Sequence, residues 1–223
     1  MLSQGLSVFS KIKSMNYLLK ALIVMIAGLS YSFINVFSIY LLVALGGEIN
    51  PAVQFSLGIT ELSVFIFIEI LFFFFIFYSL RLIRKASSYN YYYYFTIISF
   101  LLIIISVVLL SINFNNLNSG VLFSFSTIYL FPIFASNSIF FYFIYKLLKE
   151  NYTGNIIYSA LFVSILNILL NIVGYILSTN PLFYFVTFLL IIIFLIFLIL
   201  TFFALRKALR KVEEIVVNML ISV

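Results

Sequence analysis

Six apolar stretches, each about as long as a bilayer is thick, dominate this sequence of 223 residues. A helix needs about 20 consecutive, mostly apolar residues to cross the hydrocarbon core of a membrane. Stretches of that kind cover residues 21–45, 53–80, 95–112, 121–144, 156–177 and 182–205. They are apolar on every side, unlike the amphipathic helices of a water-soluble bundle. The sequence therefore predicts an all-α, polytopic membrane helix bundle with six transmembrane helices.

The composition indicates the same class and excludes many catalytic sites. Hydrophobic residues make up 65% of the chain and charged residues 8%, too few charges to cover a soluble protein of this size. Cys and His are absent, and all six acidic residues are Glu. Ligands for haem, copper and iron–sulfur clusters are therefore missing, as are the Ser-His and Cys-His pairs of intramembrane proteases. We expect a protein that is not an enzyme and that has no cofactor and no metal site.

The basic residues predict the orientation, because Lys and Arg near the ends of spans stay in the cytoplasm. All twelve fall on one side of the six predicted spans: Lys11, Lys13, Lys20, Arg81, Arg84, Lys85, Lys146, Lys149, Arg206, Lys207, Arg210 and Lys211. The opposite loops carry only Glu48. We therefore expect a multi-pass protein of the cell membrane with both termini in the cytoplasm. The net charge of +6 indicates attraction to anionic lipids at that face and gives no case for nucleic-acid binding.

Both ends of the chain have an amphipathic pattern. Leu2, Leu6, Phe9 and Ile12 recur at helical spacing, which predicts an interfacial helix over residues 1–20 ahead of a transmembrane domain over residues 21–205. Residues 206–223 continue an apolar stripe that begins at Leu205. This C-terminal segment either extends the sixth helix along lipid or forms a docking surface for a cytoplasmic partner.

Small and polar residues predict which helices touch, since such residues line helix contacts in membranes. They recur every three or four residues in three of the spans: Gly28, Ser32 and Asn35 in the first, Ser124, Thr127, Ala135 and Ser138 in the fourth, and Ala160, Ser164, Asn167, Asn171, Gly174 and Ser178 in the fifth. We expect these three helices to contact one another, with Pro132 as a hinge in the fourth. The third and sixth spans lack such a pattern and are expected to face lipid.

Two acids inside the second span are the main candidates for function. Glu61 and Glu69 are eight residues apart, about 80° around the helix and about 12 Å along it. No Lys or Arg lies at a similar depth, so we expect Glu69 to be neutral. Our hypothesis is that protonation of Glu69 opens a polar path lined by Asn35, Asn167 and Asn171. The alternative is a neutral Glu that bonds to one of these Asn residues and stabilises the packing.

One loop has a local similarity to a known family. Gly46-Gly47-Glu48-Ile49-Asn50-Pro51-Ala52-Val53 resembles the first pore loop of aquaporins, whose Asn-Pro-Ala motif caps a half-helix, and Asn180-Pro181 falls where that family has its second motif. The resemblance implies Asn50 and Asn180 as pore asparagines. The chain departs from the family pattern at Glu48, where aquaporins have His, and it has only one predicted span before Asn50. The other interpretation is an ordinary turn built from Gly, Asn and Pro.

The leading functional hypothesis is a transport-related, permease-like membrane subunit, acting as a homo-oligomer or with other membrane subunits. Six spans with cytoplasmic termini are shared by many permease subunits, including the membrane halves of export-type ABC transporters. No predicted loop is large enough for an ATP site, so ATP-driven transport would need a separate ATPase. The alternative of a different class is a non-catalytic scaffold subunit of a larger membrane complex. An aquaporin-like channel is a minor alternative.

Overall fold

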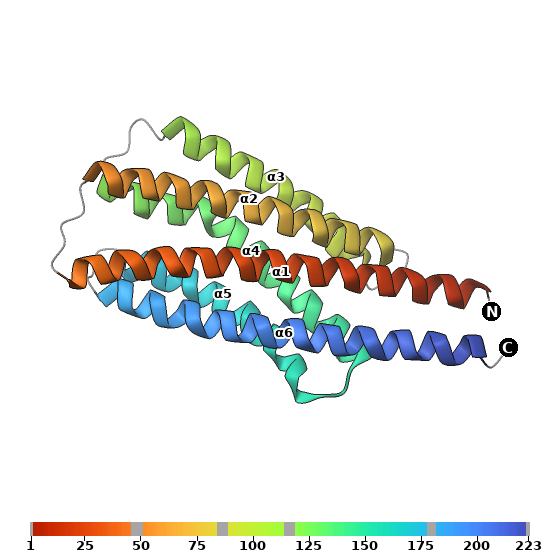
Figure 1. Ribbon diagram of the computed structural model, residues 1–223. Helices are drawn as coiled ribbons and strands as arrows, with labels where there is room; N and C mark the ends of the chain where they lie inside the picture. The colour runs from red at the N-terminus through yellow and green to blue at the C-terminus, as the bar shows by residue number, and fades with distance from the viewer. Residues whose placement is uncertain (1, 46–50, 84–88, 114–118, 178–181, 222–223) are drawn as a thin grey trace.

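A computed structural model describes residues 2–45, 51–83, 89–113, 119–177 and 182–221 (Figure 1). Within these ranges there is no strand. The described elements are six α-helices and one short 3-10 turn: α1 (Leu2–Ala44), α2 (Pro51–Ile83), α3 (Asn90–Asn113), α4 (Ser119–Asn151), η2 (Asn155–Ile157), α5 (Tyr158–Leu177) and α6 (Leu182–Ile221). The prediction of an all-helical chain with six helices is confirmed.

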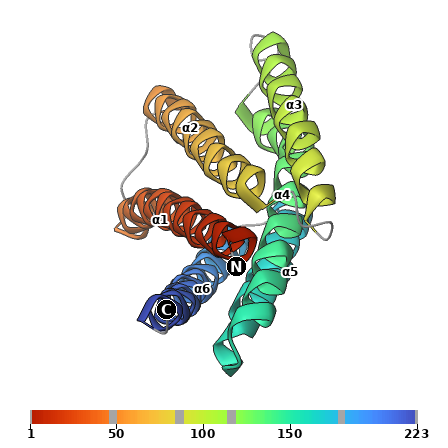
Figure 2. The same ribbon diagram turned by 90° about the vertical axis from the view of Figure 1, so that its right-hand side faces the viewer.

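The helices form a closed ring. Each helix packs against the next one along the chain, and α6 returns to pack against α1. Seen from the end in Figure 2, α2, α1 and α6 lie on one side of the ring and α3, α4 and α5 on the other. Successive helices run in opposite directions, so the start of α1 and the end of α6 lie at the same end of the bundle (Figure 1). We call this the terminal end of the bundle.

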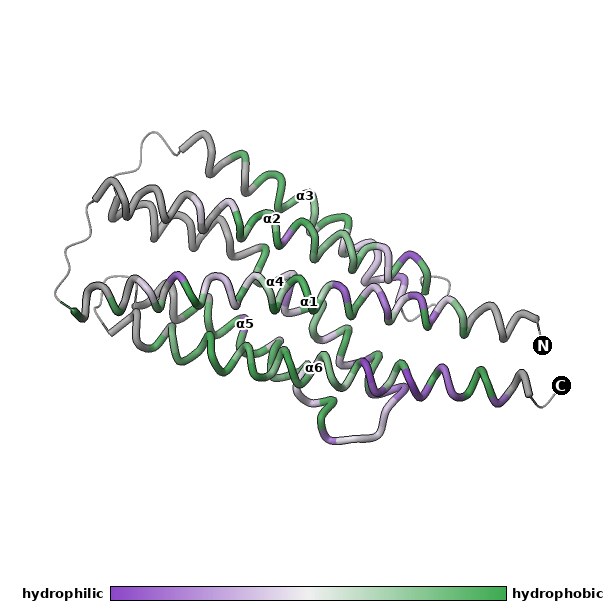
Figure 3. The backbone as a smooth tube through the Cα atoms, in the orientation of Figure 1, coloured by the Kyte–Doolittle hydropathy of each residue, from purple (hydrophilic) through white to green (hydrophobic). Residues whose placement is uncertain are grey.

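Three helices contain segments that are long and apolar enough to cross a membrane. Among the described residues these segments are Val8–Asn35, Ser63–Ile83 and Phe188–Asn218. Shorter apolar helical segments cover Asn90–Ile105 and Asn155–Leu170. Figure 3 shows hydrophobic residues along most of the helices and a concentration of hydrophilic residues in the last part of α6. These segments support a membrane location.

The first and last helices are much longer than a membrane crossing requires. α1 has 43 residues and α6 has 40, so at about 1.5 Å per residue each is roughly twice as long as the hydrocarbon core is thick. α1 continues without interruption through Lys20, and α6 continues through Leu205. The predicted domain boundaries at residues 20 and 206 are therefore not helix ends. An N-terminal segment lying along the membrane surface stays a prediction.

Phenylalanine side chains fill the space between α2 and α4. Phe72 stacks on Phe141 with ring centroids 5.9 Å apart, and Phe73 meets Phe140 edge to face at 5.2 Å. All four side chains are buried. These four rings are the main contact between the two helices at this level.

The predicted contact among the first, fourth and fifth helices is only half right. α4 and α5 pack closely, but α1 packs on α2 and α6. Gly28 shows the reason, because a Cβ at this position of α1 would overlap the side chain of Ile68 on α2. The small residues of α1 thus accommodate its immediate neighbour along the chain.

The sixth helix was expected to face lipid, and the structure gives it two different faces. One face of α6 is buried against α1 and α5 and includes Phe194, Leu198 and Leu205, while Ile196 and Phe203 are exposed. A helix made almost entirely of Leu, Ile and Phe carries no periodicity that distinguishes its two faces. α3 follows the prediction, since it contacts only α2 and α4 extensively and exposes most of its large apolar side chains.

Candidate functional site

A buried carboxyl–amide pair joins α2 to α4. Glu69 lies near the middle of α2 with 1% of its surface exposed, and Asn137 lies on α4 with 2% exposed. The Asn137 side-chain amide donates from Nδ2 to both carboxyl oxygens of Glu69, at 2.9 Å and 3.1 Å. Neither group reaches water, so each depends on the other for its polar contact.

Aromatic rings enclose this pair along the helix axes. One turn before it, Phe65 of α2 stacks on Phe134 of α4 with centroids 5.9 Å apart. One turn after it lie the contacts of Phe72 with Phe141 and of Phe73 with Phe140. The carboxyl is therefore in surroundings of low polarity, where a charge is strongly disfavoured unless it is paired. Among the described residues, no Lys or Arg forms an ion pair with Glu69.

One polar atom of the Asn137 amide has no hydrogen-bond partner among the described residues. Its Oδ1 is buried and accepts no hydrogen bond from the residues that the structure describes. An Asn side chain has a donor group and an acceptor group on opposite sides of one rotatable amide. It can donate from Nδ2 to an ionised Glu69, or rotate so that Oδ1 accepts the O–H of a protonated Glu69. The pair can thus satisfy the carboxyl in both protonation states.

The opposite side of α4 bonds to α5. Ser164 Oγ donates to the main-chain oxygen of Ser138 at 2.7 Å. Asn167 Nδ2 donates to the main-chain oxygen of Phe134 at 2.6 Å and to Ser138 Oγ at 3.2 Å. Asn137 and Ser138 are adjacent on a helix and point about 100° apart, so α4 connects Glu69 on α2 with the polar face of α5. We call the residues from Ser136 to Ser138 the α4 polar segment.

The structure describes the side chains of three predicted pathway residues, Glu69, Asn35 and Asn167. The hydrogen-bond partner of Glu69 is Asn137, and neither Asn35 nor Asn167 contributes a hydrogen bond to it. Asn35 is partly exposed on α1, and Asn167 bonds to α4 as described above. The side chains of Glu61 and Asn171 fall outside the described part of the structure.

The residues predicted for packing and bending are also distributed among different contacts. Ser164 lies at the contact of α4 with α5, Gly28 at that of α1 with α2, and Ser32 is partly buried on α1. α4 is helical through Pro132 and α5 through Gly174, while the surroundings of these two residues are outside the described set. A hinge at Pro132 stays a prediction.

Asn137 was missed by sequence reasoning, although a signal for it was present. Small and polar residues were sought that share one face of the fourth span, and the face found contains Ala135 and Ser138. Asn137 lies on a neighbouring face and was therefore not included. An Asn in the middle of an apolar span is itself a strong sign of a buried polar contact. α4 uses two faces, one for α2 and one for α5, and a search for a single stripe finds only one of them.

Of the aquaporin-like segment, the structure describes only residues 51–53, and these begin a long helix. α2 begins at Pro51 and continues for 33 residues to Ile83, whereas the resemblance implies a half-helix that ends inside the membrane. Proline at the first position of a helix is common, because its missing N–H needs no partner there. Asn50 and Asn180 lie outside the described residues.

Further polar contacts tie the helices together toward the terminal end of the bundle. Ser14 of α1 and Ser79 of α2 share a buried hydrogen bond of 2.8 Å, and Thr201 of α6 donates to Ser159 of α5 at 3.0 Å. The phenol of Tyr89, just before α3, donates to the Glu150 carboxylate near the end of α4. Burial, together with this hydrogen bond, raises the pKa of Tyr89 above its ordinary value.

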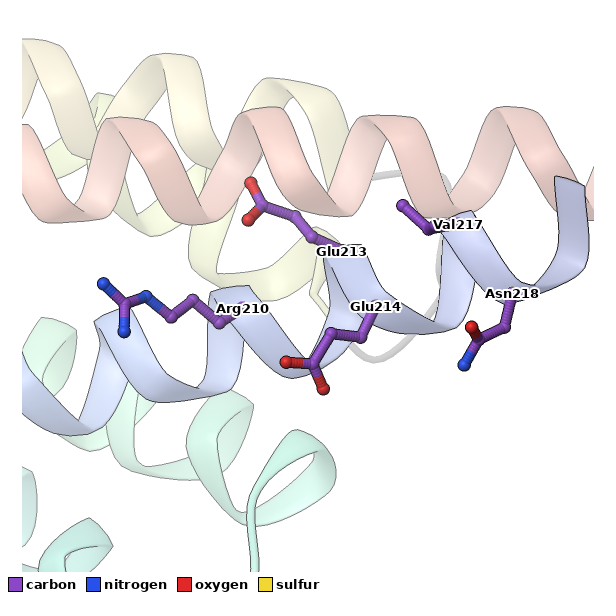
Figure 4. Close-up of a pocket in the computed structure, with 5 residues that line it drawn as sticks. All are labelled: Arg210, Glu213, Glu214, Val217 and Asn218. Atoms are coloured by element: carbon purple, nitrogen blue, oxygen red, sulfur yellow. The ribbon is translucent and has the colours of Figure 1, made fainter. Parts of the chain in front are cut away.

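The recesses found on the described surface lie along α6 and away from Glu69. One is lined by Arg210, Glu213, Glu214, Val217 and Asn218 (Figure 4). A second lies nearer the apolar part of α6 and is lined by Phe203, Arg206, Lys207 and Arg210. In the described residues no three His, Cys, Asp or Glu side chains are grouped so as to hold a metal ion. Glu69 and Asn137 are buried and line neither of these two recesses.

Comparison with known proteins gives no relative: no family model, curated protein or solved structure matches this chain.

Proposed function

We propose that this chain is a transport-related integral membrane subunit in which Glu69 binds and releases a proton. In this proposal the six helices cross the cell membrane and both termini are cytoplasmic, so that the terminal end of the bundle is the cytoplasmic end. The observation that carries it is the buried Glu69–Asn137 pair, enclosed by phenylalanine rings in the middle of an apolar bundle.

Physical cost supports a functional role for this carboxyl. An ionisable side chain inside a membrane is expensive to bury, and such residues typically belong to ion or proton pathways. A carboxyl needed only for packing could be replaced by an amide or a hydroxyl without the penalty of a potential charge. Asn137 is a suitable partner for a group that changes its protonation state, since its amide can act as donor or acceptor.

The position of α4 indicates how a proton could affect the bundle. α4 contacts Glu69 through Asn137 and contacts α5 through Ser138 and Phe134. A change in the Glu69–Asn137 hydrogen bond therefore acts on the helix that also holds Ser164 and Asn167. We propose that a change in the protonation of Glu69 makes the Asn137 amide exchange its donor for its acceptor, which alters the contact of α2 with α4 and admits water to this polar layer, which then serves as a gate or pathway.

A scaffold subunit is the second candidate function, and the α4–α5 contacts favour it. Ser164 and Asn167 both bond to main-chain oxygens of α4, which is the geometry of a static packing contact between helices. In that case the chain would hold other membrane subunits together, and Glu69 would be a permanently neutral group. As a transport subunit the chain would act as a homo-oligomer, or with other membrane subunits or a separate ATPase.

Water access to Asn167 distinguishes the two functions. Because the chain has no Cys, an Asn167→Cys variant carries a single thiol that can be reacted with a membrane-impermeant reagent in reconstituted vesicles. Transport predicts labelling from one side of the membrane, with a rate that depends on pH and loses that dependence when Glu69→Gln is added. Ile168→Cys is the matched control. Ile168 is next to Asn167 in the chain, but its side chain is exposed on the outside of the bundle, so a thiol there should face lipid and stay unlabelled.

Two outcomes would remove the transport proposal. If Asn167→Cys reacts from neither side at any pH, the polar layer is a packing contact and the scaffold function is correct. If it reacts with the same pH dependence in the presence and absence of Glu69→Gln, access is controlled by a group other than Glu69. The intrinsic reactivity of a thiol rises with pH, so each rate is divided by that of a small free thiol at the same pH.

A further inference from the structure

A compact group of positive charges follows the apolar part of α6. Arg206, Lys207 and Arg210 are all exposed, and together with Phe203 they are spaced at i, i+3, i+4 and i+7. This spacing places all four on one face of the helix. The same four residues line one recess. We call them the α6 basic recess.

The α6 basic recess lies on the side of the helix that faces away from the bundle. The neighbouring positions Ala204, Leu205 and Ala208 are buried against the other helices, whereas Phe203 is 46% exposed. In the described part of the chain no carboxylate forms an ion pair with any of its three basic side chains. Three unpaired cations within about two helical turns repel one another, so an anion bound among them would relieve that repulsion.

The two ends of the recess have different chemistry. Phe203 lies in the apolar part of the candidate span Phe188–Asn218, and the three cations follow Phe203 within the same span. Helical side chains incline toward the N-terminus of their helix, which for α6 is the direction of the apolar segment. Figure 4 shows the Arg210 side chain extending that way, away from Glu213. The recess therefore presents positive charge next to an exposed aromatic ring, which is the chemistry that a phospholipid headgroup and its acyl chain would meet if α6 is inserted in a membrane.

We propose that the α6 basic recess binds the headgroup of one anionic phospholipid, with the phosphate among Arg206, Lys207 and Arg210 and an acyl chain along Phe203. Arg contacts a phosphate through two parallel N–H groups, which provides more specificity than attraction to a charged surface. The inference depends on insertion of α6 into a membrane and is independent of any role of Glu69. A Glu69→Gln protein should bind this lipid normally, so failure of one proposal does not imply failure of the other.

Lipid titration of the purified protein tests this proposal. The full chain in detergent is titrated with phosphatidylglycerol or with phosphatidylcholine of the same acyl chains, and the thermal unfolding midpoint and the lipids retained in native mass spectrometry are recorded. We expect phosphatidylglycerol, and not phosphatidylcholine, to raise the midpoint and to stay bound. Each basic residue near a membrane surface contributes about a factor of five in affinity, so removing three should weaken binding roughly a hundredfold.

A matched pair of variants separates a defined site from general attraction. The site variant carries Arg206→Gln, Lys207→Gln and Arg210→Gln. The control variant removes three exposed charges from the other helices toward the same end: Lys13→Gln, Lys20→Gln and Lys149→Gln. We expect only the site variant to lose phosphatidylglycerol binding. If the triple site variant does not fold, Lys207→Gln is compared with Lys13→Gln, and only Lys207→Gln should weaken binding several-fold.

Three results would overturn the proposal. Equal loss of binding in the site and control variants would mean that positive charge attracts the lipid without a site. Equal stabilisation by phosphatidylcholine, which carries the same phosphate diester but no net charge, would mean that the recess does not select an anionic lipid. Equal stabilisation by soluble glycerol phosphate would mean that the recess binds a free phosphate compound and not a lipid.

Discussion

Replacing Asn137 by Leu tests whether the carboxyl–amide pair contributes to the stability of the bundle. Leu is close to Asn in size and removes both polar atoms of the amide. Glu69 would then stay buried without its observed partner, which donates to its two carboxyl oxygens at 2.9 Å and 3.1 Å. An unsatisfied buried polar group costs about 1–3 kcal/mol, so the free energy of unfolding should fall by that amount.

A double-mutant cycle isolates the contact itself. The stability of wild type, Asn137→Leu, Glu69→Leu and the double variant is measured by reversible unfolding in mixed detergent micelles, followed by circular dichroism. Side-chain hydrogen bonds inside membranes contribute roughly 0.6 kcal/mol on average and up to about 1.7 kcal/mol. With a carboxyl as one partner, we expect a coupling energy of about 1–2 kcal/mol, near the upper limit.

The same cycle with a different Asn of α4 provides the control. Asn151 donates to the main-chain oxygen of Leu147 within its own helix, so Asn151→Leu should show no coupling to Glu69→Leu. The reasoning would be refuted if Asn137→Leu costs the same whether residue 69 is Glu or Leu. The two side chains would then make independent contributions, and their hydrogen bonds would have no energetic value.

Three further perturbations test other contacts. Gly28→Leu should destabilise the protein by about 1–3 kcal/mol through overlap with Ile68, and Ile68→Ala should restore part of that loss in the same unfolding assay; additive losses would contradict this. Asn167→Ala should cost about 1 kcal/mol by removing the hydrogen bonds to α4, and an unchanged unfolding free energy would contradict it. The raised pKa of Tyr89 means that its neutral phenol, bonded to Glu150, stabilises the fold below about pH 10 and that this contribution declines as the pH rises further. The stability advantage of wild type over Tyr89→Phe should therefore shrink between about pH 8 and about pH 11, and a constant difference would contradict it.

The helical class and the number of helices could be predicted from the sequence because both depend on local hydrophobicity. Apolar stretches separated by polar breaks indicate where the helices are, and this requires no information about which helices pack against each other. Lys20 and Arg206 were predicted as domain limits and not as helix ends, and α1 and α6 are continuous there. A basic residue can mark a membrane surface without interrupting a helix.

Contacts between helices were predicted less well, and for a physical reason. In hydrocarbon the faces of a Leu- and Phe-rich helix are nearly equivalent, so the buried face of α6 around Leu198 has no distinctive sequence pattern. Small residues mark a contact but not its partner, which is why Gly28 was assigned to the wrong neighbouring helices. Glu69 could be identified because an acidic residue inside an apolar span is rare. Its partner could not, because which residue of α4 faces Glu69 depends on how α4 is rotated about its axis relative to α2.

Infrared difference spectroscopy of Glu69 is the most direct measurement of the central claim that this carboxyl binds and releases a proton. Spectra of reconstituted wild type are recorded over a pH titration, and the carboxylic acid band that is missing in Glu69→Gln is assigned to this residue. We expect that band to decrease as the pH rises, and to change frequency in Asn137→Leu, where the hydrogen-bond partner is absent. A Glu69 band that is unchanged over the whole pH range in which the protein stays folded would contradict a transport role and would leave Glu69 as a permanently neutral packing residue.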